Sequence, residues 1–207
     1  MIEFTSFFLG FIFAFILGLI ILYGLGFDYK YMYYRFIAKE EPSEIHIEAI
    51  FIDKVYEKLI EYVKTHNVMC MVTTMNEYEL FRVTYGFGYT LDGFSRILRD
   101  RYKVLAEYAK IGLHTHVAPN EVIDSFSYED QYLKLVKGYN FLKSMNIIVK
   151  DFAPGWWSYN DITIDVCEDI GIKNFHVNIN ELKGCEKSNK LNFIHVRKFI
   201  HDYEFVK

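Results

Sequence analysis

The run Val68-Met-Cys-Met-Val-Thr-Thr74 decides the fold class, because it is a short and continuous apolar segment. A strand that is covered on both faces has this composition, and such strands are typical of parallel sheets. Further short runs of this kind occur at about 111–115, 147–151, 173–177 and 191–195. The sequence therefore predicts a set of buried parallel strands.

Helical patterns separate these runs. The first one, at about 50–65, places Val55 and Leu59 on one side and Lys54 and Lys58 on the other. Later helices are expected at about 91–109, 128–145 and 159–170, the last ending at Gly171, the usual type of C-terminal cap residue. Alternating strands and helices predict an α/β fold, in which crossover helices join parallel strands.

An uncharged stretch from Phe4 to Phe27, rich in Phe, Leu and Ile, precedes this domain. About 24 residues at about 1.5 Å each give about 36 Å of helix, enough to cross a hydrocarbon core of about 30 Å. A cleaved signal peptide is the alternative, but Glu3 is the only charged side chain before the stretch and no A-x-A site follows it. We therefore expect a transmembrane helix at 4–27 with the lipid bilayer as its partner, a juxtamembrane linker at 28–44 and the folded domain at 45–207.

The charges beside this stretch bear on its orientation. Lys30, Arg35 and Lys39 follow it, whereas the N-terminal side has only the α-amino group. The positive-inside rule favours a cytoplasmic domain on a single-pass protein, and the lack of an N-x-S/T sequon agrees with that. Because so few charges are involved, the side of the membrane stays open.

Composition narrows the classes of function. Hydrophobic residues make up 52 % of the chain and aromatic residues 18 %, which is ample for a packed core and argues against disorder. The formal charge of −4 shows no basic excess, so we expect no nucleic-acid partner. Cys70, Cys167 and Cys185 form no CxxC pair, which predicts free thiols rather than disulfides or a zinc site.

Two histidines follow one predicted strand in Ile111-Gly-Leu-His-Thr-His-Val-Ala-Pro119. Parallel α/β sheets place their chemistry at the carboxyl ends of the strands. His114 and His116 could form half of a metal site there, if the strand continues and keeps them on one face. Alternatively, one of them packs in the core and the other is solvated.

A turn that opens a helix follows another predicted strand, in Lys150-Asp-Phe-Ala-Pro-Gly-Trp-Trp-Ser-Tyr-Asn160. Ser158 or Asn160 could cap the helix. The adjacent Trp156 and Trp157 could stack on a sugar ring, or they could belong to the core. His201-Asp-Tyr-Glu204 adds an imidazole and carboxylates near the terminus, where charged side chains are usually solvated.

Together, four segments resemble, in order, the motifs of polysaccharide deacetylase domains (NodB-homology, carbohydrate esterase family 4-like). They are Val72-Thr-Thr-Met-Asn-Glu-Tyr78, Leu113-His-Thr-His-Val-Ala-Pro119, Phe152-Ala-Pro-Gly-Trp-Trp-Ser-Tyr-Asn160 and Phe199-Ile-His201, and the likeness covers residues 45–207. The resemblance implies an incomplete or distorted (β/α) barrel. It also implies a divalent metal such as zinc, held by one Asp and two His, that serves to hydrolyse N- or O-acetyl groups on glycans.

The resemblance implies roles for particular residues and also shows departures. Met75 stands at the position of the base and Asn76 at that of the metal-binding Asp. His114 is a metal-ligand position, its partner position is occupied by Ala118, and His201 fits the histidine that acts as general acid.

The third motif also departs, since Phe152 stands where an Arg is expected. In that segment Pro154, Trp156 and Trp157 are the expected substrate-binding residues. Glu77 and His116 are the substitutes nearest in sequence: Glu77 as catalytic carboxylate, and His116 as a metal ligand beside His114 and Asn76.

These departures leave three hypotheses open. Loss of a general base costs about 10²–10⁴ in rate, and a neutral amide binds a metal more weakly than a carboxylate. We therefore expect a membrane-anchored, deacetylase-like protein with impaired or altered catalysis that acts on or binds a glycan or a lipid-linked sugar. The alternatives are an active metal-dependent hydrolase of acetylated sugars and a membrane-attached interaction module without small-molecule chemistry.

Overall fold

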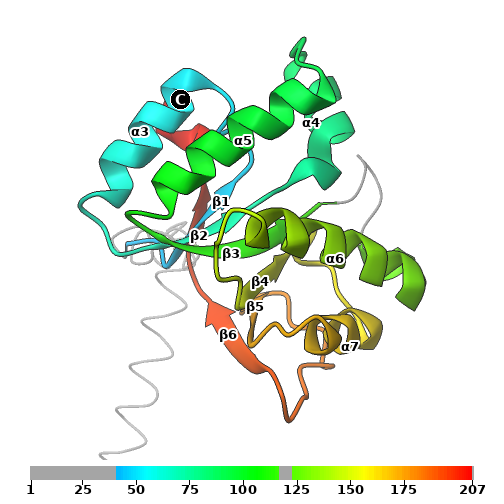
Figure 1. The fold of residues 1–207 in the computed structure, drawn as a ribbon. Coiled ribbons are helices and arrows are strands. Elements are labelled where there is room, and N and C mark those ends of the chain that lie inside the picture. Colours follow the sequence, from blue (N-terminus) through cyan, green and yellow to red (C-terminus); the bar gives the residue numbers. More distant parts are fainter. Residues whose placement is uncertain (1–40, 117–122, 207) are drawn as a thin grey trace, which may run out of the picture. The chain divides into compact units, whose positions relative to one another are not determined.

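All strands of the computed structural model, which describes residues 41–116 and 123–206, belong to one sheet. They are β1 (Glu44–Ile47), β2 (Met69–Val72), β3 (Lys110–Thr115), β4 (Asp151–Pro154), β5 (Asn174–Asn178), β6 (Asn192–Val196) and β7 (Phe199–His201). Every pairing is parallel, in the order β6-β5-β4-β3-β2-β1-β7 (Figure 1). The predicted parallel α/β class is confirmed.

Helices connect most of these strands and lie along one side of the sheet (Figure 1). They are α3 (Asp53–Val63), α4 (Tyr78–Tyr85), α5 (Leu91–Leu105), α6 (Tyr128–Lys143) and α7 (Asp161–Asp169). Short 3₁₀ turns complete the chain at η1 (Met75–Glu77), η2 (Ile123–Ser125), η3 (Gly155–Trp157) and η4 (Asp202–Val206). Of the two caps that the sequence left open, Asn160 caps α7, since its side chain accepts a hydrogen bond from the Thr163 N–H. Gly171 follows that helix, as predicted, with a φ of 89°.

Alternation along each strand separates two faces of the sheet. On β1, Ile45 and Ile47 are buried in the main core against the helices, whereas Glu44 and His46 point to the opposite face, which we call the inner face. The other strands continue both faces. Cys70, Val72, Ile111, Leu113, Phe152, Phe175 and Val177 belong to the core, and Met71, His114, Ala153 and His176 belong to the inner face.

The sheet is strongly curled around this inner face. Three strands lie between β1 and β5, so four spacings of about 4.8 Å would separate them by about 19 Å in a flat sheet. Glu44 Oε2 nevertheless accepts a hydrogen bond from His176 Nδ1 at 2.7 Å. The inner face is therefore the interior of a barrel-like sheet that side chains fill.

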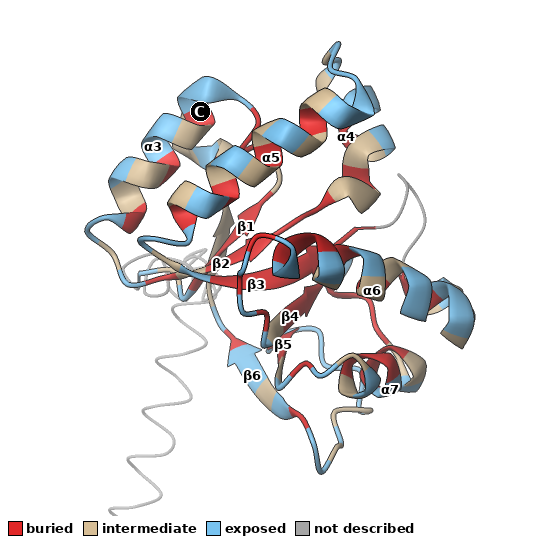
Figure 2. Ribbon diagram, in the orientation of Figure 1, coloured by how far each residue is buried: buried red, intermediate tan, exposed pale blue. Residues whose placement is uncertain are grey.

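The two outer strands of the sheet, β6 and β7, follow each other directly in one segment of the chain. Its first part, β6, pairs with β5; after Arg197 and Lys198, its second part, β7, pairs with β1. Ser43 N donates to the Lys198 carbonyl at 3.0 Å and extends the contact to β1. Because β6 itself is largely exposed (Figure 2), the barrel is incomplete on this side.

Some boundaries differ from the prediction. The strand expected at 147–151 begins only at Asp151, and β1, β7 and α4 were not predicted. The sequence did not predict β1 because Glu44 and His46 interrupt its apolar pattern. Glu44 was expected in the linker, but it is the first residue of this buried strand.

The predicted transmembrane helix at 4–27, most of the linker at 28–44, and Ala118 lie outside the described residues. Within the described part, no helix has both the length and the apolar character needed to cross a bilayer.

Candidate metal centre

A carboxylate and two imidazoles converge at the carboxyl ends of β1 and β3. Glu48 directly follows β1, His114 lies on β3, and His116 directly follows β3. Their ligand atoms all lie within 4.8 Å of one another. His116 Nε2 is 2.8 Å from both His114 Nε2 and Glu48 Oε1, and His114 Nε2 is 3.7 Å from Glu48 Oε1.

The hydrogen bonds around these atoms favour a cation between them. His114 Nδ1 lies 2.9 Å from the Ala153 carbonyl, which can only accept, so Nδ1 carries the proton and Nε2 presents a lone pair. His116 Nε2 can then offer one proton at most to two acceptors, His114 Nε2 and Glu48 Oε1. A divalent cation would satisfy all three atoms, and Glu with two His is a ligand set of catalytic zinc sites.

Their protonation also suits metal binding. Burial by itself would raise the pKa of Glu48, but the two imidazoles beside it, His114 and His116, hold it well below its usual value. Burial, and next the neighbouring His116, lower the pKa of His114. A charged carboxylate and a neutral imidazole are the forms that ligate metals.

Two further carboxylates hold the backbone of the ligands. Asp202, in η4, accepts hydrogen bonds from the N–H groups of Glu48 and Ala49 at 2.9–3.0 Å. Glu77 accepts from the N–H groups of His116 at 3.0 Å and Thr74 at 2.8 Å. Both carboxylates are completely buried, and burial raises the pKa of Asp202 to about 7 and that of Glu77 to about 8.

A cavity of about 160 Å³ opens beside the three ligands. It is lined by His46, Glu48, His114, His116, Trp156, Trp157, Phe199, His201 and Tyr203. His201 Nε2 is 3.5 Å from Glu48 Oε1, and its side chain is 26 % exposed. His46 donates from Nε2 to Glu44 at 2.7 Å, and burial lowers the pKa of this imidazole to about 4.

The two tryptophans of η3 have different environments. Trp157 is buried, with its ring 5.1 Å from that of His46 and 5.0 Å from that of Phe199. Trp156 is 60 % exposed, and its ring lies 5.0 Å from that of His116. Both have positive φ angles, 57° and 50°, which side-chain-bearing residues adopt at a cost, so the turn holds Trp156 outward under strain.

Several residues predicted for the site do meet in it. His114, His116, His201, Trp156 and Trp157 all line the cavity. Pro154 is buried at the end of β4, where it leads into the Trp156 turn rather than lining the cavity.

Asn76 and Glu77, by contrast, are not in the cavity. The Asn76 amide donates to the Lys134 carbonyl on α6 at 2.8 Å, and the Glu77 carboxylate is occupied by backbone N–H groups as described above. The structure therefore brings Glu48, which follows β1, to the two histidines, and not Asn76 or Glu77 of the predicted first motif at 72–78. The alternation of Glu44, His46 and Glu48 at every second residue was the signal in the sequence that could have located it.

No protein-family model and no curated protein matches the chain. Similar solved structures include the Streptococcus pyogenes deacetylase PplD in complex with acetate, at 14 % identity and TM-score 0.45, over 65 % of this chain and 55 % of that one. A family 4 carbohydrate esterase from Streptomyces lividans, also in complex with acetate, is 8 % identical at TM-score 0.45, over 77 % of both chains. The deacetylase domain of BpsB from Bordetella bronchiseptica is 11 % identical at TM-score 0.45, over 74 % of this chain and 69 % of that one.

These proteins are of the kind that the sequence motifs resemble. At such identities and TM-scores the likeness carries no argument about activity. The chain also spans little more than half of the streptococcal structure. What the domain can do is therefore argued from the residues of its own site.

Proposed function

We propose that this domain is a metal-dependent hydrolase that removes a small acyl group, such as acetyl, from a glycan. The observation that carries the proposal is the convergence of Glu48, His114 and His116 within 4.8 Å at the carboxyl edge of the sheet. The resemblance of the sequence to deacetylase motifs supports the choice of acyl group and glycan.

The departure at Asn76 does not weaken this metal site. Impaired catalysis was expected because the segment at 72–78 lacks the two carboxylates of the first motif. Glu48 supplies a charged carboxylate from β1 instead, so the ligand set is complete without Asn76. This supports the hydrolase over the impaired protein and over an interaction module without bound metal.

Residues around the cavity would bind the metal, transfer a proton and position a ligand. Glu48, His114 and His116 would hold a divalent cation, which when bound would supply Lewis-acid polarisation of a carbonyl group. His201, on the rim of the cavity beside Glu48, is placed to pass a proton to or from a group bound there. His46 is fixed by Glu44 and packs against His114, with ring centroids 4.3 Å apart, so it positions that ligand.

The cavity offers room for a small group beside the ligands. A volume of about 160 Å³ is enough for an acyl group such as acetyl. The sugar would stay outside, where the exposed Trp156 offers an aromatic surface for it.

The test is zinc binding by the full chain, measured against a competing chelator, together with acetate release from N-acetylated and O-acetylated oligosaccharides. We expect stoichiometric zinc, lost in Glu48→Gln and in His114→Ala, and acetate release that needs the metal. His195→Ala is the matched control, because this histidine is exposed on β6 and lies apart from the cavity. Zinc binding equal in Glu48→Gln and wild type would overturn the proposal.

A further inference from the structure

Most of the strands carry opposite charge at their two ends. The described segments that follow β1, β2, β3, β4 and β7 contain no Lys or Arg, and their acidic residues are Glu48, Glu77, Asp124, Asp202 and Glu204. At the opposite ends of β2, β3, β4 and β5, Lys64, Lys150 and Lys173 precede β2, β4 and β5 and Lys110 opens β3, with Glu107 before β3 and Asp151 at the start of β4 as the acidic residues. We call the latter side the basic edge. It stands out in a chain whose formal charge is −4.

The lysines of the basic edge form a row across neighbouring strands. Lys110 opens β3, and Lys150 and Lys173 directly precede β4 and β5. Lys173 N donates to the Lys150 carbonyl at 2.8 Å, so these two residues are adjacent, and all three are exposed. A lysine in the last turn of a helix, such as Lys103 of α5, is explained by the helix dipole. The other three lie outside helices, so the dipole does not account for them.

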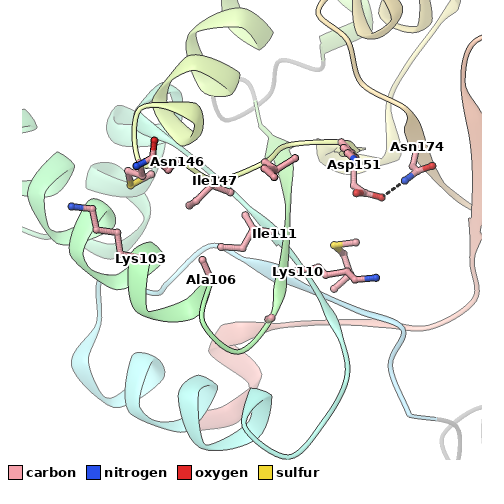
Figure 3. A pocket seen from close by; sticks show the side chains of 13 residues that line it. Lys103, Ala106, Lys110, Ile111, Asn146, Ile147, Asp151 and Asn174 are labelled. Carbon is pink, nitrogen blue, oxygen red and sulfur yellow. Dashed lines mark hydrogen bonds between the residues drawn. The ribbon is translucent and has the colours of Figure 1, made fainter.

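A groove of about 620 Å³ runs along this edge (Figure 3). Figure 3 shows Ile111 and Ile147 between Lys103 and Lys110, and both are largely buried, so they form an apolar floor of the groove. Beside it, Ile148 is 77 % exposed and precedes Lys150 by two residues. Exposed apolar side chains among lysines are typical of surfaces that lie in the headgroup region of a membrane.

We propose that the basic edge docks on an anionic phospholipid surface, with the lysines on the phosphates and Ile148 in the interface. The reasons are charge complementarity between the exposed lysines and the phosphates, and the exposed Ile148 beside those lysines. The acidic edge, with the metal centre, then faces away from the lipid.

The experiment uses the full chain with a fluorophore that reports polarity, attached through Ile148→Cys in a Cys185→Ser background. Cys70 and Cys167 are fully buried and stay unlabelled. The protein is reconstituted with vesicles of phosphatidylcholine alone, or of phosphatidylcholine mixed with phosphatidylglycerol. We expect a blue shift of emission in the mixed vesicles only, and its loss at high salt.

Substitutions then separate the basic edge from net charge. Lys110→Gln, Lys150→Gln and Lys173→Gln together should abolish the shift. The matched control combines Lys54→Gln, Lys137→Gln and Lys183→Gln, which removes the same charge from exposed positions elsewhere and should retain the shift. Circular dichroism checks that both variants are folded.

The proposal is overturned if emission is the same in both kinds of vesicle, or if the two triple variants lose the shift equally. It is also overturned if soluble glycerophosphoglycerol alone produces the shift, because the groove would then bind a free anion. None of the substituted residues touches the metal centre, so these outcomes are independent of zinc binding.

Discussion

At the scale of single residues, each ligand of the metal centre is held by a second polar group from elsewhere in the chain. The Ala153 carbonyl fixes the His114 ring, Glu77 binds the His116 backbone, and Asp202 binds the Glu48 backbone. Such outer partners orient ligands and tune their affinity for the metal. Glu77, which was predicted to be the catalytic carboxylate, instead binds the backbone beside a ligand.

Glu48 and Asn76 make the sharpest comparison between sequence and structure. Glu48→Ala should lower zinc affinity by more than about 100-fold, because it removes a ligand rather than an outer partner. Asn76→Ala should leave zinc affinity unchanged, since its amide is bonded to α6. A chelator competition titration measures both, and a large loss in Asn76→Ala with none in Glu48→Ala would restore the sequence-based assignment.

Gly155 is needed for the approach of η3 to the end of β3. A Cβ at this position would lie 2.4 Å from the Thr115 carbonyl oxygen and 2.9 Å from the His116 Cα, and neither backbone atom can move aside easily. Gly155→Ala should therefore destabilise the protein by about 1–3 kcal/mol in urea unfolding and also weaken zinc binding.

Gly112→Ala is the comparison for this prediction. Its Cβ would meet the flexible end of Met71, at 2.5 Å from Sδ, which can adjust its rotamer. We expect a smaller loss of stability and no change in zinc affinity. Equal effects of the two glycine substitutions would contradict the assignment of Gly155 to a backbone contact.

At the scale of elements, the turn η4 and the end of β1 act as one unit. Asp202 accepts three hydrogen bonds from the Glu48–Ala49 backbone, so the C-terminal turn fixes the direction in which Glu48 leaves its strand. Asp202, for which the sequence indicated no role beyond that of a charged residue near the terminus, thus supports the site.

Asp202→Asn should disturb this unit while keeping the size of the side chain. The amide has one acceptor oxygen in place of two, so the N–H groups of Glu48 and Ala49 lose part of their bonding. We expect the free energy of unfolding to fall by about 1–3 kcal/mol and the zinc affinity to weaken by about 10–100-fold. Glu204→Gln, which alters an exposed carboxylate in the same turn, is the control and should change neither quantity.

At the scale of the whole molecule, buried charges hold the curled sheet together across its interior. His176 on β5 donates from Nδ1 to Glu44 on β1 and from Nε2 to Asp151 on β4, at 2.7 and 3.1 Å. Burial would lower the pKa of His176, but hydrogen bonds to Asp151 and Glu44 outweigh it and raise that pKa to about 9. Burial would raise the pKa of Glu44. The hydrogen bonds from His176 and His46 outweigh burial and lower that pKa to about 2.

These shifts predict how stability depends on pH. A histidine whose pKa is higher in the folded state than its unfolded value of about 6.5 stabilises the fold fully below that value. The stabilisation is lost as the pH rises through about 9. The free energy of unfolding, measured in urea, should therefore fall by up to about 3 kcal/mol as the pH rises from about 6.5 through about 9.

Direct titration checks the cause. An NMR titration of the His176 imidazole should give a pKa well above its ordinary value, with both ring nitrogens protonated near neutral pH. A pKa below the ordinary value would show that burial prevails over Glu44 and Asp151, and the predicted loss of stability would then have another origin.

The sequence by itself determined the parallel α/β class, the strands β2, β3, β5 and β6, the major helices, and the histidines of the site. It could do so because these features depend on local patterns: apolar runs, helical spacing and pairs of imidazoles after a strand. The uncharged stretch at 4–27 is equally local, and its membrane helix stays a prediction.

Only the tertiary structure decided which carboxylate joins His114 and His116. β1 carries polar side chains on its inner face, so it lacks the apolar run that marked the other strands, and Glu48 was overlooked. The curl of the sheet brings residues far apart in sequence, such as Glu44 and His176, into contact at 2.7 Å. Contacts of this kind depend on strand order and curvature, which the local sequence pattern does not encode.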